Sequence, residues 1–361
     1  MHTMLEFRTE QLNQELLQNL HEEFHENLAD AENLIIELEH QPKETEKLSA
    51  LFRNIHTVKG NLSIAQLPPL IPVLQELEDV LSLVRQGELE FNPKIGDLSL
   101  LLLDHVKTFL NDSLESETVF YDAKLYEDVG IQINKISTHS DPELQILKAL
   151  ALLNHNQPSL IEIEESMLHN QFPEQYPDLT YFANLIPSVE NRMPQWKGRT
   201  NRLLNLAHRM LDGSQYDFDF EQIAAAIYTH DIAMSFLPIK LLSREQPMTQ
   251  NEKKQIKAHV YACSFLLSQS EHWQQASRIL HEHHEWVNGL GYPKGLTEND
   301  IHPGAMCLSI IHAYEAITHG HYYKSDYQRP VKRALVELSK LSNQQFSAFW
   351  VERLITSLYI H

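Results

Sequence analysis

Residues 51–62 read LFRNIHTVKGNL, and this stretch indicates the kind of fold that surrounds it. Its apolar residues recur at helical spacing and share one side of the helix with a leucine just before them; they are Leu48, Leu51, Phe52, Ile55 and Leu62. A helix with one apolar side has to bury that side against other elements. The stretch therefore predicts an amphipathic helix, beginning near Glu46, within a packed helical domain.

A similar pattern precedes this helix. Spacings of three and four residues place a set of apolar side chains on one stripe, formed by Phe24, Leu28, Ala31, Ile35 and Leu38. The polar segment QPKET around Pro42 breaks the pattern. The two stretches therefore predict two consecutive helices joined by a short connection.

Two further helices are expected after it. Pro68, Pro69 and Pro72 end or restart the helix, because proline lacks the amide hydrogen that a helix interior requires. The next apolar stripe ends near Gly87 and consists of Val73, Leu77, Val80, Leu81 and Val84. A fourth helix begins after Pro93 with the apolar run LSLLLLDHVKTFL. Four amphipathic helices with short connections predict an antiparallel bundle, to which a fifth helix can be added.

The composition limits the function classes. The chain has 361 residues, 42% of them hydrophobic, and a formal net charge of -20. A surface this acidic repels phosphate backbones and anionic lipids, which argues against nucleic acid or membrane surfaces as partners. No stretch approaches the roughly 20 apolar residues of a membrane span, and the amino-terminal segment has no apolar signal core. We expect a cytoplasmic protein.

The chain divides into three parts. The segment THSDPE around residue 140 is a plausible boundary, and a second helical domain starts near Arg199. We expect a first domain over residues 1–138, a helical linker region over 139–195 and a second domain over 196–361. Because no strong alternating pattern is visible, the predicted fold class is all-α.

A group of polar residues accompanies the apolar side of the 51–62 helix. His56 lies beside the stripe, and Lys59 follows three residues later on the same face, where its ammonium can steady a phosphate. Gly60 removes side-chain bulk next to the imidazole, at a position where glycine costs a helix about 1 kcal/mol relative to alanine. Glu78 on the next helix can accept a hydrogen bond from one ring nitrogen and fix the tautomer. The alternative is an ordinary surface histidine.

These residues resemble the histidine phosphotransfer (HPt) family, in particular the domain at the start of chemotaxis-type histidine kinases. The resemblance rests on FR at 52–53, HTVKG at 56–60, LQELED at 74–79 and LVRQG at 83–87. It implies that His56 takes the phosphoryl group, supported by Lys59 and Glu78, and that Gln75 replaces a second histidine of the network. The implied partners are the receiver domain of a response regulator, a histidine kinase, or both.

The second half contains a set of side chains that suit a metal ion. Imidazole nitrogens and carboxylate oxygens bind borderline divalent metals such as Fe, Mn, Ni or Zn. Residues of this type occur in YTHD, KAHV and HEHHE and are His230, Asp231, His259, His283 and His284. A carboxylate such as Asp231 has two oxygens and is able to bridge two metals. The alternative is a packed helical domain whose histidines hold no metal.

This half resembles the HD-GYP family, whose active members hydrolyse cyclic di-GMP. His230–Asp231 match the HD motif, and Gly291, Tyr292 and Pro293 match the GYP motif. The resemblance implies that Asp231 joins His259, His283 and His284 at one metal position, and that a cyclic dinucleotide is a candidate ligand.

Several family residues are missing. Arg199 or Asn201 stands near the position of the first ligand histidine, Met234 replaces a phosphate-handling lysine, and His312 occupies the place of the last ligand aspartate. The aspartate usual before the GYP glycine is Asn288. We therefore expect at most one metal ion, with His312 assisting, and a degenerate domain.

The sequence leaves three hypotheses. In the first, His56 exchanges a phosphoryl group with a receiver aspartate, and the second domain is an inactive regulatory or binding module. In the second, a metal-dependent site hydrolyses cyclic di-GMP or another phosphoester and is gated by phosphorylation of His56. In the third, the chain is a scaffold and neither site is chemically active.

Overall fold

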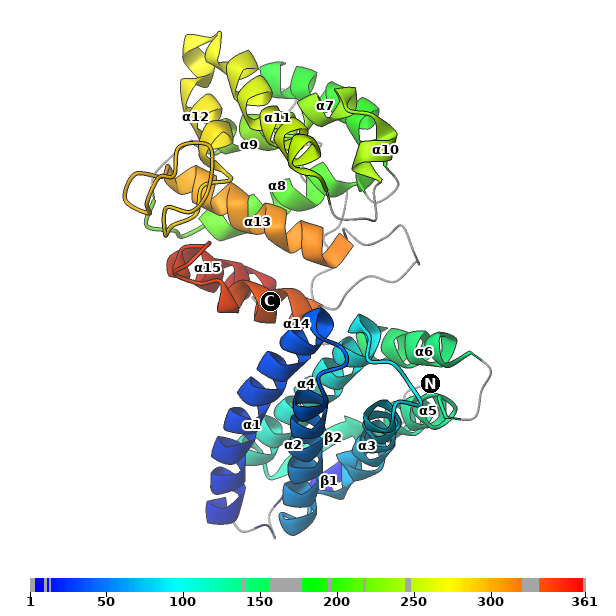
Figure 1. Ribbon diagram of the computed structural model, residues 1–361. Coiled ribbons are helices and arrows are strands. Elements are labelled where there is room, and N and C mark those ends of the chain that lie inside the picture. The colour runs from blue at the N-terminus through cyan, green and yellow to red at the C-terminus, as the bar shows by residue number, and fades with distance from the viewer. Residues whose placement is uncertain are drawn as a thin grey trace. The chain divides into compact units, whose positions relative to one another are not determined.

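The computed structural model describes residues 4–9, 12, 14–137, 141–155, 177–193, 196–216, 219–243, 248–319 and 331–359. Helices dominate both halves of the chain, which confirms the predicted all-α class (Figure 1). Internal contacts divide the chain into two units, residues 1–158 and 159–361. No helix among the described residues is long and apolar enough to span a bilayer.

The first unit is built on a helical bundle. Its four long helices are α1 (Gln14–His40), α2 (Thr45–Ile64), α3 (Ile71–Gln86) and α4 (Pro93–Glu115). A short 3-10 helix, η1 (Pro68–Leu70), precedes α3 at the predicted proline cluster. Helices α5 (Ala123–Asn134) and α6 (Pro142–His155) pack against α3 and α4 respectively and against each other. The predicted four-helix bundle with an added helix is thus confirmed.

Local sequence signals explain these helix boundaries. Gly87 ends α3 in the left-handed conformation, with φ of 76°, which glycine adopts without steric cost. Asn92 caps α4 by accepting hydrogen bonds from the amides of Lys94 and Ile95, and Pro93 occupies the first turn. Because α4 is covered by α1 on one side and α6 on another, its apolar run is buried throughout its first half.

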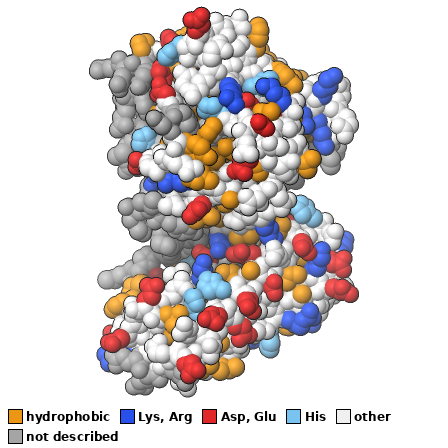
Figure 2. All heavy atoms as spheres, turned by 90° about the vertical axis from the view of Figure 1, so that its left-hand side faces the viewer, with side chains coloured by type: hydrophobic (Ala, Val, Ile, Leu, Met, Phe, Trp, Pro, Cys, Tyr) orange, Lys and Arg blue, Asp and Glu red, His pale blue; other side chains and the backbone are white. Residues whose placement is uncertain are grey.

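A small β-ribbon pairs the amino-terminal segment with the connection between α4 and α5, and the sequence does not predict it. Strand β1 (Met4–Arg8) pairs antiparallel with β2 (Thr118–Asp122). Both strands have five residues, and Val119 is the only one of the ten that is buried, so neither shows the alternation of apolar and polar residues that marks a half-buried strand. Charged side chains are scattered over the surface of the first unit, as the net charge leads one to expect (Figure 2).

The second unit surrounds a short buried helix, α9 (Phe220–Thr229), which carries the HD motif at its end. The other long helices of this unit are α7 (Pro177–Glu190), α8 (Arg199–Leu211), α11 (Gln250–Ser268), α12 (Gln274–Glu282), α13 (Pro303–His319), α14 (Val331–Lys340) and α15 (Ala348–Tyr359). Among its described residues the unit also has the short helices η3 (Ile232–Phe236), α10 (Ile239–Leu242) and η4 (Glu271–Trp273). Contacts of α9 with α7, α8, α12 and α13 enclose its apolar surface.

The expected linker region supplies a helix to each unit. Helix α6 packs against α4 and α5, whereas α7 packs against α9 and η3. Residues 156–176, the middle of that region, lie outside the described residues. The division at 138 and 195 stays a prediction.

Candidate functional site

His56 lies on the exposed edge of α2 and is oriented by a carboxylate on α3. Its Nδ1 is 3.1 Å from Oε1 of Glu78, and 62% of its side chain is exposed. The ring stacks on Phe52, with centroids 6.3 Å apart and planes 9° apart. With Nδ1–H donating to the carboxylate, the lone pair resides on Nε2. The histidine thus presents a nucleophilic nitrogen to an approaching protein.

Lys59 and Gln75 complete a network around Glu78. The Lys59 ammonium lies 2.5 Å from Oε2 of Glu78 and donates to Oε1 of Gln75 at 2.6 Å. Gln75 in turn donates to Asp79 at 2.9 Å. Burial raises the pKa of Glu78, but the hydrogen bonds from Lys59 and His56 outweigh it and leave the pKa below its usual value. Glu78 is therefore ionised at neutral pH.

Gly60 has no packing role within the part of the chain that the structure describes. A Cβ atom placed on it meets no atom within 4 Å. The absence of a side chain at this position is therefore not explained by packing within the first unit, which agrees with an approach of a partner protein over Gly60.

The second constellation brings together residues from four parts of the second unit. His230 and Asp231 follow α9, His259 lies on α11, His283 and His284 follow α12, and His312 lies on α13. Their ligand atoms form two groups, each with all atoms within 4.8 Å of one another: one of His259, His283 and His284, and one of His230, Asp231 and His312.

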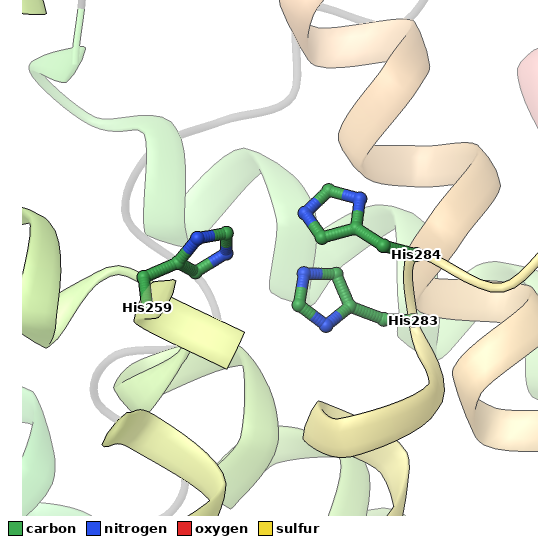
Figure 3. Close-up of side chains that lie close together, drawn as sticks. All are labelled: His259, His283 and His284. Carbon is green, nitrogen blue, oxygen red and sulfur yellow. The ribbon is translucent and has the colours of Figure 1, made fainter. Parts of the chain in front are cut away.

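The first group, the three-histidine cluster, has the arrangement of metal ligands (Figure 3). Nδ1 of His259 and of His283 each donates to a backbone carbonyl at 2.6 Å, that of Ile256 and of Leu280 respectively. The Nε2 atoms of both rings are buried and have no hydrogen-bond partner in the described chain. Burial lowers the pKa of His259 and lowers that of His283 to about 3, so both rings are neutral. Neutral imidazoles oriented through the other nitrogen are the form that binds metals.

The second group, formed by His230, Asp231 and His312, is in contact with the guanidinium cation of a nearby arginine. Arg199, the first residue of α8, places Nη1 2.5 Å from Oδ2 of Asp231. Burial raises the pKa of Asp231, but the charge of this guanidinium together with the contacts of His230 and His312 outweighs it and holds the pKa well below its usual value. His230 donates Nδ1–H to the Ile227 carbonyl at 2.5 Å, and its Nε2 lies 3.2 Å from the same carboxylate oxygen.

Of Arg199 and Asn201, the two residues near the position of the missing ligand, the structure places Arg199 in contact with Asp231. The resemblance implies that Asp231 shares a metal position with the three histidines, whereas the geometry groups this carboxylate with His230 and His312.

The GYP segment positions His284. Its ring stacks on Tyr292, with centroids 4.9 Å apart and planes 19° apart. A Cβ atom on Gly291 would overlap the backbone of Glu285 and Trp286, so only glycine fits there. Pro293 follows Tyr292 through a cis peptide bond.

The sequence does not predict two contacts around the GYP segment. The Lys257 ammonium lies 4.1 Å from the centroid of the Tyr292 ring, and no motif marked this lysine. Buried Glu285 accepts hydrogen bonds from the amides of Lys294 and Leu296, at 2.5 and 3.0 Å, and thereby holds the loop in place.

Comparison with known proteins agrees with both halves. The family model for the Hpt domain matches residues 15–112, and that for the HD domain matches residues 184–347. Over 76 residues the chain is 40% identical to the sensor histidine kinase CheAY of Helicobacter pylori, covering 21% of the chain and 10% of that protein. It is 34% identical over 99 residues to the chemotaxis protein CheA of Borreliella burgdorferi, covering 27% of the chain and 11% of that protein.

The second half of the chain is similar to a different class of proteins, the cyclic di-GMP phosphodiesterases. Over 133 residues the chain is 29% identical to a cyclic di-GMP phosphodiesterase of Thermotoga maritima, which is 36% of each protein. The chain thus spans between 10% and 36% of the length of these relatives. With the helical bundle around His56 and the histidine cluster of the second unit, these matches agree with the two resemblances: the chain carries an Hpt domain over residues 15–112 followed by an HD domain over residues 184–347.

Proposed function

We propose that this chain is a phosphorelay protein in which His56 carries a phosphoryl group that it exchanges with the aspartate of a receiver domain. The observation that supports the proposal is the pairing of an exposed imidazole with an ionised carboxylate, Nδ1 of His56 lying 3.1 Å from Oε1 of Glu78. An unpartnered surface histidine has neither a fixed tautomer nor a charge to stabilise its protonated form.

The network supports a simple transfer. The Nε2 lone pair of His56 attacks the phosphorus of the receiver's aspartyl phosphate, the N–P bond forms and the P–O bond to the aspartate breaks. The phosphorylated ring keeps the proton on Nδ1 and gains positive charge, which the Glu78 carboxylate stabilises. Lys59 uses two of its three N–H donors on Glu78 and Gln75, which leaves one for a phosphoryl oxygen. The reverse steps return the group to a receiver.

For the HD domain we propose a regulatory or binding module with one divalent metal, Fe, Mn, Ni or Zn, at the three-histidine cluster. The residues fit such an ion because two of the rings direct buried, unpartnered Nε2 atoms into the cluster. A bound ion would act there as a Lewis acid towards an anionic ligand.

A second candidate function is a metal-dependent cyclic di-GMP phosphodiesterase gated by phosphorylation of His56. The complete three-histidine cluster favours it, as does the similarity to the Thermotoga maritima phosphodiesterase. Met234, in place of the lysine expected from the resemblance, speaks against it, because its side chain supplies no charge for a phosphate.

The phosphotransfer proposal can be tested with a receiver domain of the chemotaxis response-regulator class, charged with labelled acetyl phosphate. We expect the label to move to the chain within the time that the receiver alone retains it. His56→Gln should abolish this transfer, whereas His40→Gln, at the exposed end of α1, should leave it intact. A His56→Gln protein that labels like the wild type would refute the proposal.

The purified chain also serves to decide whether the HD domain is a regulatory or binding module or a phosphodiesterase. Protein loaded anaerobically with each of the four metals is incubated with cyclic di-GMP and the nucleotides are separated. Product that Asp231→Asn does not form would establish the phosphodiesterase. Intact nucleotide under every metal would support the regulatory module.

A further inference from the structure

The two ligand groups of the HD domain differ in one respect. The three-histidine cluster contains neutral side chains only, whereas Asp231 in the second group forms an ion pair with Arg199. Both partners are well shielded, since only 11% of the Arg199 side chain and 10% of the Asp231 side chain are exposed. The one negative charge among these ligands is thus already neutralised by a covalently attached cation.

We propose that Arg199 replaces a metal ion at His230, Asp231 and His312, so that this group excludes a divalent cation and any metal is restricted to the three-histidine cluster. The inference concerns the metal centre proposed above and deepens it by fixing the number of ions. A divalent ion at Asp231 would have to share the carboxylate with the Arg199 guanidinium, which lies 2.5 Å from Oδ2. The positive charges of the ion and of the guanidinium would then repel each other strongly inside the protein.

The position of Arg199 is built into the fold. Glu190, on α7, accepts hydrogen bonds from the amides of Gly198 and Thr200, at 2.8 and 2.9 Å, and so fixes the backbone on both sides of the arginine. Gly198 has a φ of 72°, which favours glycine over other residues. The guanidinium also lies 5.8 Å from the ring centroid of Trp196.

The next turn of α8 is equally fixed. Arg202 forms three hydrogen bonds with the carboxylate of Glu315 on α13, at 3.1, 3.1 and 2.5 Å. Only 2% of the Glu315 side chain is exposed. Since α13 also carries His312, the start of α8 and the second ligand group are held together, and Arg199 has no need of a metal to stay in place.

The test counts ions in the full chain. Wild type and the variants Arg199→His, Arg199→Ala and Arg199→Lys are loaded anaerobically with Mn(II), desalted, and analysed for manganese per chain. Electron paramagnetic resonance then distinguishes isolated from spin-coupled ions. Thermal unfolding by circular dichroism verifies that each variant is folded.

We expect Arg199→His to bind one Mn(II) more per chain than the wild type, with a spin-coupled signal. Arg199→Ala, which removes the cation without adding a ligand, should gain the same ion at lower affinity. Arg199→Lys keeps a positive charge and should bind no more than the wild type. A coupled pair in the wild type, or no gain in either folded variant, would overturn the inference.

Failure of this inference can be told apart from failure of the proposed metal centre. The centre predicts that wild type binds one ion and that His283→Ala loses it. A wild type that binds neither manganese nor, in parallel loadings, iron, nickel or zinc would refute the centre, but a gain in Arg199→His would still support the exclusion by Arg199. A wild type with two ions would refute the exclusion and leave the centre standing.

Discussion

Replacing Gly60 with alanine should make the Hpt domain more stable and a poorer phosphotransfer partner at the same time. Gly60 lies inside α2, four residues after His56, and an added Cβ meets nothing within 4 Å in the described chain. Within the isolated chain the substitution therefore brings only the better helix propensity of alanine. A docked receiver must approach this same surface to reach His56.

The two effects have different magnitudes. Helix propensity contributes about 1 kcal/mol, which corresponds to a melting temperature higher by roughly 4 °C for a domain of this size. An extra methyl group in a close-packed interface costs about 1–3 kcal/mol, or about 5- to 150-fold in the rate of transfer.

The assay combines calorimetric unfolding with the rate of transfer from a charged receiver. Gly130→Ala on α5 is the matched control, since a Cβ there makes only an ordinary contact of 3.9 Å with Glu76. It should raise stability to a similar extent without slowing transfer. If Gly60→Ala transferred as fast as Gly130→Ala, the proposed approach of the partner over Gly60 would be refuted.

Three further predictions follow from the described contacts. Glu78→Gln keeps an acceptor for His56 but removes the charge, so transfer should slow by about tenfold, as the loss of about 1.4 kcal/mol of charge stabilisation implies. His283→Ala should abolish metal binding and leave transfer to His56 unchanged. The pKa of Glu315 is lowered to about 2 because its contacts with His319 and Arg202 outweigh burial. Its contribution to stability is therefore present above its unfolded pKa of 4.5 and is lost as the pH falls from there towards 2. Glu315→Gln should destabilise the HD domain by about 3–5 kcal/mol at pH 7. The free energy of unfolding of this variant should also change less between pH 4.5 and pH 2 than that of the wild type.

Each of these has a clear contrary result. Unchanged transfer in Glu78→Gln would mean that the carboxylate charge does not act on the phosphorylated ring. Metal retained by folded His283→Ala would place the ion elsewhere. For Glu315→Gln, the free energy of unfolding in urea is measured between pH 2 and 7. If it fell with pH in parallel with that of the wild type, the Glu315 ion pair would not contribute to the loss of stability in acid.

Much of the fold could be predicted because helical periodicity is a local property. The stripe from Phe24 to Leu38 is buried on α1, and the residues that start and stop helices, such as Gly87 and Pro93, act within one turn. The sequence does not predict the β1–β2 ribbon, because its partners are more than a hundred residues apart and only Val119 of the two strands is buried.

The sites depend on contacts that spacing alone does not specify. The resemblance pairs His56 with Glu78, but the sequence does not show that Glu78 and Gln75 already engage two of the three N–H donors of Lys59. Likewise, Arg199 stood out as a departure from the family pattern, yet its contact with Asp231 depends on how the start of α8 packs near the end of α9.

The central claim is that the phosphoryl group is carried on Nε2 of His56. It is tested most directly by treating the full chain with phosphoramidate, a small donor that needs no partner protein, and recording the ³¹P NMR spectrum of the product. We predict one acid-labile phosphohistidine signal with the chemical shift of Nε2 substitution, absent from His56→Gln, because Glu78 holds the proton on Nδ1. A signal that persists in His56→Gln, or one with the shift of Nδ1 substitution, would contradict the account.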